Sequence, residues 1–174
     1  MKKAKPVTVK KIPEDHETYA ILRELVDAYH VHLAEAKIAL AFRYGWSPDQ
    51  DGYLKLGQTK KGSDLDRSLH GYDFVILLNY EVWEEITDDA VKRYIVDHEL
   101  CHCQVATDSN GQPRKDELGR TMYRLRKHDV EEFLETMERH GLLTHRLQCF
   151  AKAVLEAKNS PLFVRGESNK REAG

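Results

Sequence analysis

The run from Tyr72 to Tyr80 constrains the fold of this chain more than any other segment. Its centre, Phe74 to Leu78, reads Phe-Val-Ile-Leu-Leu, so apolar side chains fall on both faces of the alternation that a β-strand imposes. A strand that is apolar on both faces must be covered on both, and we therefore expect it to be central in a sheet. The run is also far shorter than the ~20 residues that a membrane span needs.

The spacing of apolar residues predicts further elements around this strand. The predicted helices cover Asp15–Ala34, Asp88–Val105 with Thr87 as N-cap, Asp129–His140 ending before Gly141, and Thr144–Ala157. The other predicted strands cover Ala36–Arg43, Tyr53–Lys60 and Arg120–Arg126. The polar segment Lys61–Gly71 predicts a loop. The sequence therefore indicates an α+β fold: an N-terminal helix, a small and mainly antiparallel sheet of three or four strands, and C-terminal helices.

Length and charge pattern predict one folded domain with polar ends. A chain of 174 residues suits a single domain, which we place at residues 14–158. The lysines and two prolines of residues 1–13 predict a flexible basic arm, and residues 159–174 predict a flexible charged tail. The lysines of the arm would also suit an electrostatic contact with nucleic acid.

The composition excludes several classes of protein. Its 27 Lys and Arg residues against 29 Asp and Glu residues give a net charge of −2, which does not suit a strongly basic nucleic-acid binder. A hydrophobic share of 41% is enough for a core and excludes a disordered chain. No apolar run follows the basic N-terminus, and the three cysteines form no disulfide pattern. We therefore expect a protein without a secretory signal, located in a reducing cytoplasm.

Residues 98–102 read His-Glu-Leu-Cys-His, an H-E-x-x-H motif on a predicted helix. At about 100° per residue, His98 and His102 lie one turn apart on the same side of a helix and can bind one metal ion. Glu99 is rotated by about 100° and can reach a metal-bound water instead. Zinc hydrolases need neutral nitrogen ligands, an open position and a general base. The motif therefore predicts one Zn²⁺ ion with Glu99 as the base.

The apolar residues of the same segment predict how the motif is oriented. Val96, Leu100 and Cys103 follow the spacing i, i+4, i+7 and should pack against the sheet. This packing would leave the two histidines facing a cleft between helices. Trp83 is expected to lie in the core, where the central strand meets a helix.

A zinc site that keeps a reactive water needs a third ligand from the protein. The best segment is 127–133, which reads Lys-His-Asp-Val-Glu-Glu-Phe. His128 would complete a site of three histidines, whereas Asp129 or Glu132 would give two histidines and a carboxylate. Asp129 could instead cap its own helix or orient one of the ligands.

Other polar residues rank below these as candidates. Cys101 and Cys103 flank His102, and we expect both to be buried and unreactive. His70 and His145 are expected to be structural or exposed rather than ligands. The predicted chemistry also needs a donor to the oxyanion of the transition state. The candidates for this donor are Tyr80, Tyr123 and Arg120.

Three segments together resemble the putative phage metallopeptidase family, a set of small zincin-like proteins from bacteriophages and prophages. They are Phe74–Tyr80 with Trp83, Asp97–Cys103 (Asp-His-Glu-Leu-Cys-His-Cys) and His128–Phe133 (His-Asp-Val-Glu-Glu-Phe). The resemblance extends over roughly Ile38–Phe150. A more distant resemblance is to SprT-like and Spartan proteases, in which H-E-x-x-H also precedes a third histidine. This sequence lacks the Cys-rich zinc ribbon of many SprT-like proteins and shows no DNA-binding module.

The resemblance implies a zincin-like domain over 14–158, with His98, His102 and His128 as zinc ligands and Glu99 as general base. We therefore predict a zinc metallopeptidase of phage or prophage origin, acting on a protein or peptide in the cytoplasm of the bacterial host. Two alternatives stay open. One is a non-enzymatic phage protein that zinc stabilises and that binds a host protein or nucleic acid. The other is a zinc hydrolase that cleaves a different amide. No membrane partner is expected, and the sequence predicts no oligomeric state.

Overall fold

A computed structural model of the chain describes residues 7–130, 134–142 and 144–158. The chain divides into two compact units, Met1–Lys127 and His128–Gly174, whereas the sequence predicts one domain over 14–158. The first unit contains both sheets and the first four α-helices, and the second contains two further helices. The described part of the chain is therefore α+β, as predicted.

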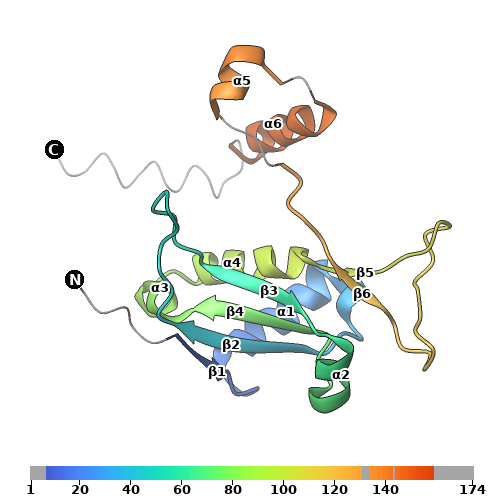
Figure 1. Ribbon diagram of the computed structural model, residues 1–174. Coiled ribbons are helices and arrows are strands. Elements are labelled where there is room, and N and C mark those ends of the chain that lie inside the picture. The colour runs from blue at the N-terminus through green and yellow to red at the C-terminus, as the bar shows by residue number, and fades with distance from the viewer. Residues whose placement is uncertain (1–6, 131–133, 143, 159–174) are drawn as a thin grey trace. The chain divides into compact units, whose positions relative to one another are not determined.

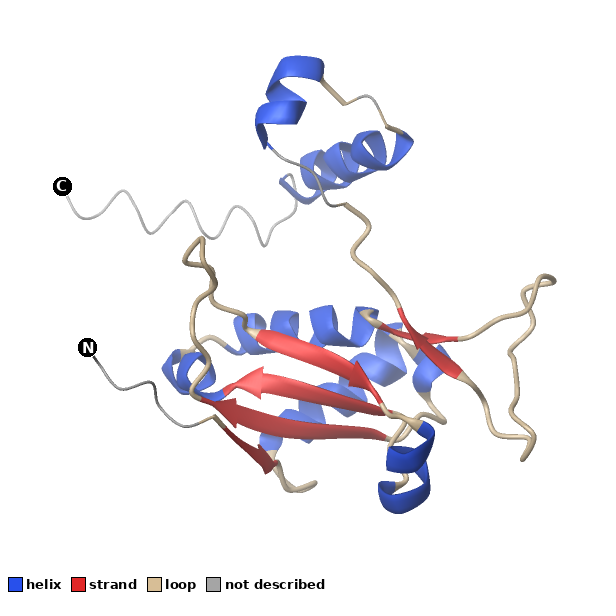
Figure 2. Ribbon diagram, viewed as in Figure 1, coloured by secondary structure: helices blue, strands red, loops and turns tan. Residues whose placement is uncertain are grey.

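The main sheet of the first unit has four strands in the order β1-β2-β4-β3 (Figures 1 and 2). Their bounds are β1 Thr8–Lys11, β2 Ile38–Tyr44, β3 Gly57–Lys61 and β4 Phe74–Asn79. The β1–β2 and β3–β4 pairs are antiparallel, whereas β2 and β4 run parallel, with Leu40 opposite Ile76. The sheet is therefore mixed. The prediction that Phe74–Leu78 lies in a central strand is confirmed, since β4 has a neighbour on each side.

Residues Thr8–Lys11 form strand β1, although the sequence predicts a flexible arm over 1–13. All four residues are exposed, and they pair with Ala41–Tyr44 of β2 through their backbones. The side-chain pattern therefore carries no sign of this strand. These four residues belong to the sheet rather than to an arm.

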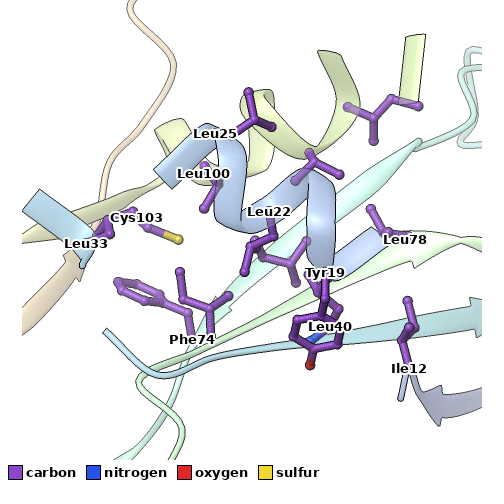
Figure 3. Packing of buried hydrophobic residues seen from close by; sticks show 14 of the residues in the cluster. Ile12, Tyr19, Leu22, Leu25, Leu33, Leu40, Phe74, Leu78, Leu100 and Cys103 are labelled. Carbon is purple, nitrogen blue, oxygen red and sulfur yellow. The ribbon is translucent and has the colours of Figure 1, made fainter. Parts of the chain in front are cut away.

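Helices α1 and α4 cover one face of this sheet (Figures 1 and 2). α1 spans Glu17–Tyr29 and is followed by a 3₁₀ turn at Val31–Leu33, while α4 spans Asp89–Cys101. Figure 3 shows Leu22 and Leu25 of α1 and Leu100 of α4 packed in one cluster with side chains of β2 and β4. This cluster buries apolar area on both layers, and it sets the position of α4 against the sheet.

Two short helices lie on either side of β4 in the sequence. α2 spans Asp64–His70, where the sequence predicts a loop, and α3 spans Tyr80–Glu85 directly after β4. Ser63 and Asp66 form a capping box at the start of α2, and Gly71 ends it with φ of +76°. None of the residues of α2 is buried, so apolar spacing could not predict it. Trp83 of α3 is 3% exposed, which confirms its place in the core.

Replacing Ser63 by alanine is expected to lower the free energy of unfolding of the first unit by about 1 kcal/mol. The Ser63 hydroxyl accepts a hydrogen bond from the Asp66 backbone N–H at 3.1 Å, and its loss exposes an unsatisfied donor at the helix start. Urea denaturation followed by circular dichroism would measure the change. Replacement of the exposed Ser68 by alanine is the control, and an equal loss there would contradict the capping role.

The end of α4 differs from the prediction. The sequence predicts a helix to Val105, but α4 ends at Cys101 and Cys103–Val105 forms strand β5. β5 pairs antiparallel with β6, Tyr123–Leu125, within the predicted strand Arg120–Arg126. The N-cap is Asp88 rather than Thr87, because the Asp88 carboxylate accepts from the Ala90 backbone N–H at 2.8 Å. The chain between β5 and β6 is closed at its base by a backbone hydrogen bond from Ala106 to Met122.

The second unit contains α5, Leu134–His140, and α6, His145–Lys158. Gly141 follows α5 with φ of +72°, as expected of a residue that ends a helix. Asp129 precedes α5 and lies outside it, although the sequence predicts that the helix begins there. No helix in the described ranges combines the length and apolar character that crossing a membrane would require.

Candidate metal centre

The last turn of α4 presents the two histidines of the motif side by side. His98 lies within α4, and His102 is its C-cap residue with helical φ and ψ of −72° and −20°. Their ring centroids are 5.2 Å apart, with 77° between the ring planes. Both residues are half-buried. The spacing of the motif therefore brings two imidazoles to one place on the surface of the helix.

The apolar side of α4 is buried as predicted. Val96 and Leu100 of α4 and Cys103 of β5 are each 0% exposed, and all three belong to the core cluster. Because this stripe is fixed against the sheet, the helix cannot rotate to move the histidines away. The packing of the core thus determines which way the motif faces.

The ring of His102 is oriented by a backbone group that sequence reasoning missed. Its Nδ1 lies 2.7 Å from the carbonyl oxygen of Arg126, and the Arg126 N–H donates to the His102 carbonyl at 2.8 Å. A carbonyl oxygen can only accept, so Nδ1 must carry the proton. In neutral imidazole the lone pair then resides on Nε2, which is the arrangement of a metal ligand held by an outer hydrogen bond.

His128 follows Arg126 by two residues, and consecutive Cα atoms are about 3.8 Å apart. The hydrogen bonds between His102 and Arg126 therefore hold the segment leading to His128 beside the end of α4. Donor atoms of His98, His102 and His128 all lie within 4.8 Å of one another. His128 is exposed. The three histidines named by the sequence are thus together.

Two carboxylates, Asp129 and Glu132, are the alternatives to His128 as third ligand. Asp129 is described and exposed, outside any helix or strand. Glu132 lies outside the described residues. Three imidazoles offer neutral nitrogen donors, which suit Zn²⁺ and leave one tetrahedral position for water. The donor set therefore fits a zinc ion.

Glu99 directly follows His98 in the chain, and its side chain is held away from solvent. It is only 4% exposed, and its Oε2 accepts a hydrogen bond of 2.7 Å from the Thr59 hydroxyl of strand β3. The same hydroxyl lies 2.9 Å from the Glu99 carbonyl oxygen. A buried carboxylate that is anchored at one oxygen has few orientations available. Thr59 is a second site residue that sequence reasoning missed, because 40 residues separate it from Glu99.

Gly57 makes room for the same carboxylate. A Cβ atom built on Gly57 would lie 2.6 Å from Oε1 of Glu99 and 2.9 Å from its carboxyl carbon. These distances are far below normal contact, so only glycine fits here without moving Glu99. A glycine within a strand often marks a close approach of this kind, and this was the one available signal in the sequence.

The remaining candidates lie in other contacts. Cys101 is exposed, contrary to the prediction, whereas Cys103 is buried and its burial raises the pKa of its thiol. His70 and His145 are both exposed, whereas the sequence leaves open whether each is structural or exposed. The three proposed oxyanion donors contact other residues: Tyr123 packs on Phe74, Arg120 pairs with Asp116, and Tyr80 stacks on Tyr44.

A family model described as putative phage metallopeptidase matches residues 10–155. The matched span includes the whole of α4, strand β3 with Gly57 and Thr59, and His128. No curated protein and no solved structure matched the chain.

Proposed function

Because the chain belongs to the putative phage metallopeptidase family, we propose that it is a zinc-dependent peptidase with a zincin-like site, of phage or prophage origin. His98, His102 and His128 would hold the ion, and Glu99 would act as general base. The observation that carries this proposal is the grouping of three imidazoles, with a buried, anchored carboxylate on the residue that follows His98. Family membership supports a metallopeptidase, and the donor set supports zinc as the metal.

Zinc bound here would supply Lewis acidity and would lower the pKa of a bound water to about 7. Glu99 then accepts the proton of the attacking water and passes it to the leaving amine. Thr59 anchors Oε2 of Glu99, so the carboxylate needs no reorganisation before it takes the proton. The hydrogen bond from His102 to the Arg126 carbonyl keeps the imidazole in the tautomer that binds through Nε2.

Strand β3 offers a place for an extended peptide. It is an edge strand whose one neighbour in the sheet is β4. Hydrogen bonds join the residues that flank β3 to the two ends of β4: the Asn79 N–H donates to the Leu56 carbonyl, and the Gly62 N–H donates to the Asp73 carbonyl. Hydrogen-bonded residues alternate in an antiparallel pair, so every second residue between these two turns its backbone groups outward. The outward-facing residues of β3 are Gly57, Thr59 and Lys61.

A peptide that adds to this edge would gain main-chain hydrogen bonds without needing a particular sequence. It would also lie beside Glu99, because Gly57 and Thr59 both lie against that carboxylate. This geometry favours peptide bonds over other amides as the substrate.

The test is to incubate the full chain with a denatured protein such as casein and to identify new peptide termini by mass spectrometry. We expect cleavage that a zinc chelator abolishes and that one equivalent of zinc restores. Bound zinc without any cleavage across a library of denatured proteins would contradict the proposal and favour the non-enzymatic alternative.

Replacing Gly57 by alanine is expected to reduce cleavage by about 10- to 100-fold, with zinc content unchanged. The new methyl group would overlap Oε1 of Glu99 and force the carboxylate out of position, and displacements of about 1 Å can have effects of this size. Initial cleavage rates and metal analysis would measure both quantities. Gln58→Ala is the matched control, since its side chain points to the other face of β3. Equal losses in the two variants would contradict the steric argument.

A further inference from the structure

A second group of potential metal ligands lies on the neighbouring stripe of α4. Asp97 and Cys101 are one helical turn apart, as His98 and His102 are, and each stands one residue earlier in the chain. The two stripes are therefore rotated by about 100° from each other. His30, at the C-terminal end of α1, lies against the stripe that carries Asp97 and Cys101. Donor atoms of His30, Asp97 and Cys101 all lie within 4.8 Å of one another.

His30 is placed by the fold rather than by its own flexibility. It is the C-cap residue of α1, and its backbone N–H donates to the carbonyls of Leu25 and Val26. Only 6% of the residue is exposed, and its Nε2 lies 2.6 Å from Oδ1 of Asp97. A buried imidazole is thus aimed at a carboxylate and a thiol on the adjacent helix.

The donors match a borderline-soft divalent ion. Imidazole, carboxylate and thiolate are all zinc ligands, with bond lengths of about 2.0–2.3 Å. A tetrahedral ion with these bonds separates its ligand atoms by about 3.3–3.7 Å. The contact between His30 and Asp97 would open by about 1 Å, as the ion replaces the proton between them. Cys101 is exposed and Asp97 is half-buried, so the remaining position can take water.

We propose that His30, Asp97 and Cys101 bind a second divalent transition-metal ion, distinct from the ion of the three histidines. Binding releases the Cys101 thiol proton to solvent, and His30 binds through Nε2 as the neutral tautomer that carries its proton on Nδ1. The site uses none of the residues assigned to the catalytic ion, so its occupancy does not depend on the peptidase activity.

Cobalt(II) titration of the full-length, reduced apoprotein distinguishes the two sites, because only a thiolate ligand gives a sulfur-to-cobalt charge-transfer band in the near ultraviolet. We expect two equivalents of Co²⁺ to bind and one of them to produce this band. Cys101→Ser should abolish the band and weaken that equivalent by at least about tenfold. Cys149→Ser, which alters the other exposed cysteine, should leave it intact.

Two further variants make the assignment specific. Asp97→Asn keeps the shape of the side chain and should weaken the band-forming equivalent, while His98→Asn should leave the band unchanged. Absence of a charge-transfer band in the wild-type protein would overturn the proposal. So would a band that persists in Cys101→Ser, or one that disappears in His98→Asn. Circular dichroism of each variant excludes loss of fold as the cause.

Discussion

The Glu99→Gln variant is expected to lose about 10²- to 10⁴-fold in cleavage rate, which is the usual contribution of a general base. Glutamine has nearly the same shape, and its amide oxygen can accept the hydrogen bond from Thr59, so the site should keep its structure. It cannot accept a proton from water. Initial rates on denatured casein, together with zinc per chain by atomic emission, would show lost cleavage at unchanged metal content.

Glu85→Gln provides a matched control, because Glu85 is an exposed carboxylate at the end of helix α3. Its activity should equal that of the wild-type protein. Wild-type cleavage by Glu99→Gln would show that Glu99 is not the base. A loss of zinc in the same variant would show that Glu99 supports the metal rather than the proton transfer.

The His128→Ala variant is expected to bind zinc at least about 100-fold more weakly and to lose cleavage at low zinc. Loss of an outer hydrogen-bond partner of a ligand costs about 10- to 100-fold in affinity, and loss of the ligand itself should cost more. Competition with a chromogenic chelator would measure the affinity. His70→Ala, at an exposed histidine of α2, should bind zinc as the wild-type protein does.

Parallel variants separate the alternatives for the third ligand. Asp129→Asn and Glu132→Gln should each retain zinc within a few-fold of the wild-type affinity. If His128→Ala keeps one tightly bound zinc while either carboxylate variant loses it, the ligand set is two histidines and a carboxylate. That result would leave the general-base role of Glu99 untouched.

The sequence predicted best those parts of the fold in which buried residues recur at the regular spacing of a helix or a strand. Phe74–Leu78 lies along β4 with almost every side chain buried, and the stripe of Val96 and Leu100 packs on the core. The relative positions of the H-E-x-x-H residues could be predicted in the same way, because they depend only on the geometry of one helix. Local periodicity was enough to place His98, Glu99 and His102 together.

The elements that the sequence did not predict lack buried residues at a regular spacing. Strand β1 is exposed along its whole length and is held by backbone pairing alone. Helix α2 has no buried residue and forms around the Ser63 cap, which apolar spacing does not register. Ser63 followed by Asp66 was available as a local signal, and it would have predicted the helix.

Contacts between distant segments account for what was missed in the site. Thr59 anchors Glu99 across 40 residues, and the Arg126 carbonyl orients His102 across 24. No pattern within either segment signals these bonds, because each depends on how β3 and β6 are brought against α4. The proposed ligands could therefore be named from the sequence, while the groups that hold them in place could not.

The short pairing of β5 with β6 separates the orientation of His102 from the tips of the loop between the two strands. Arg126 is set beside His102 by the three paired residues of each strand and by the Ala106–Met122 bond at the base of the loop. At the loop tips, a Cβ atom added to Gly111 or Gly119 would meet no other atom within 4 Å. We therefore expect a fluorophore tag or a foreign domain inserted beside Gly111 to leave the site unaltered, so that an inactive variant could be immobilised through this loop to capture its substrates.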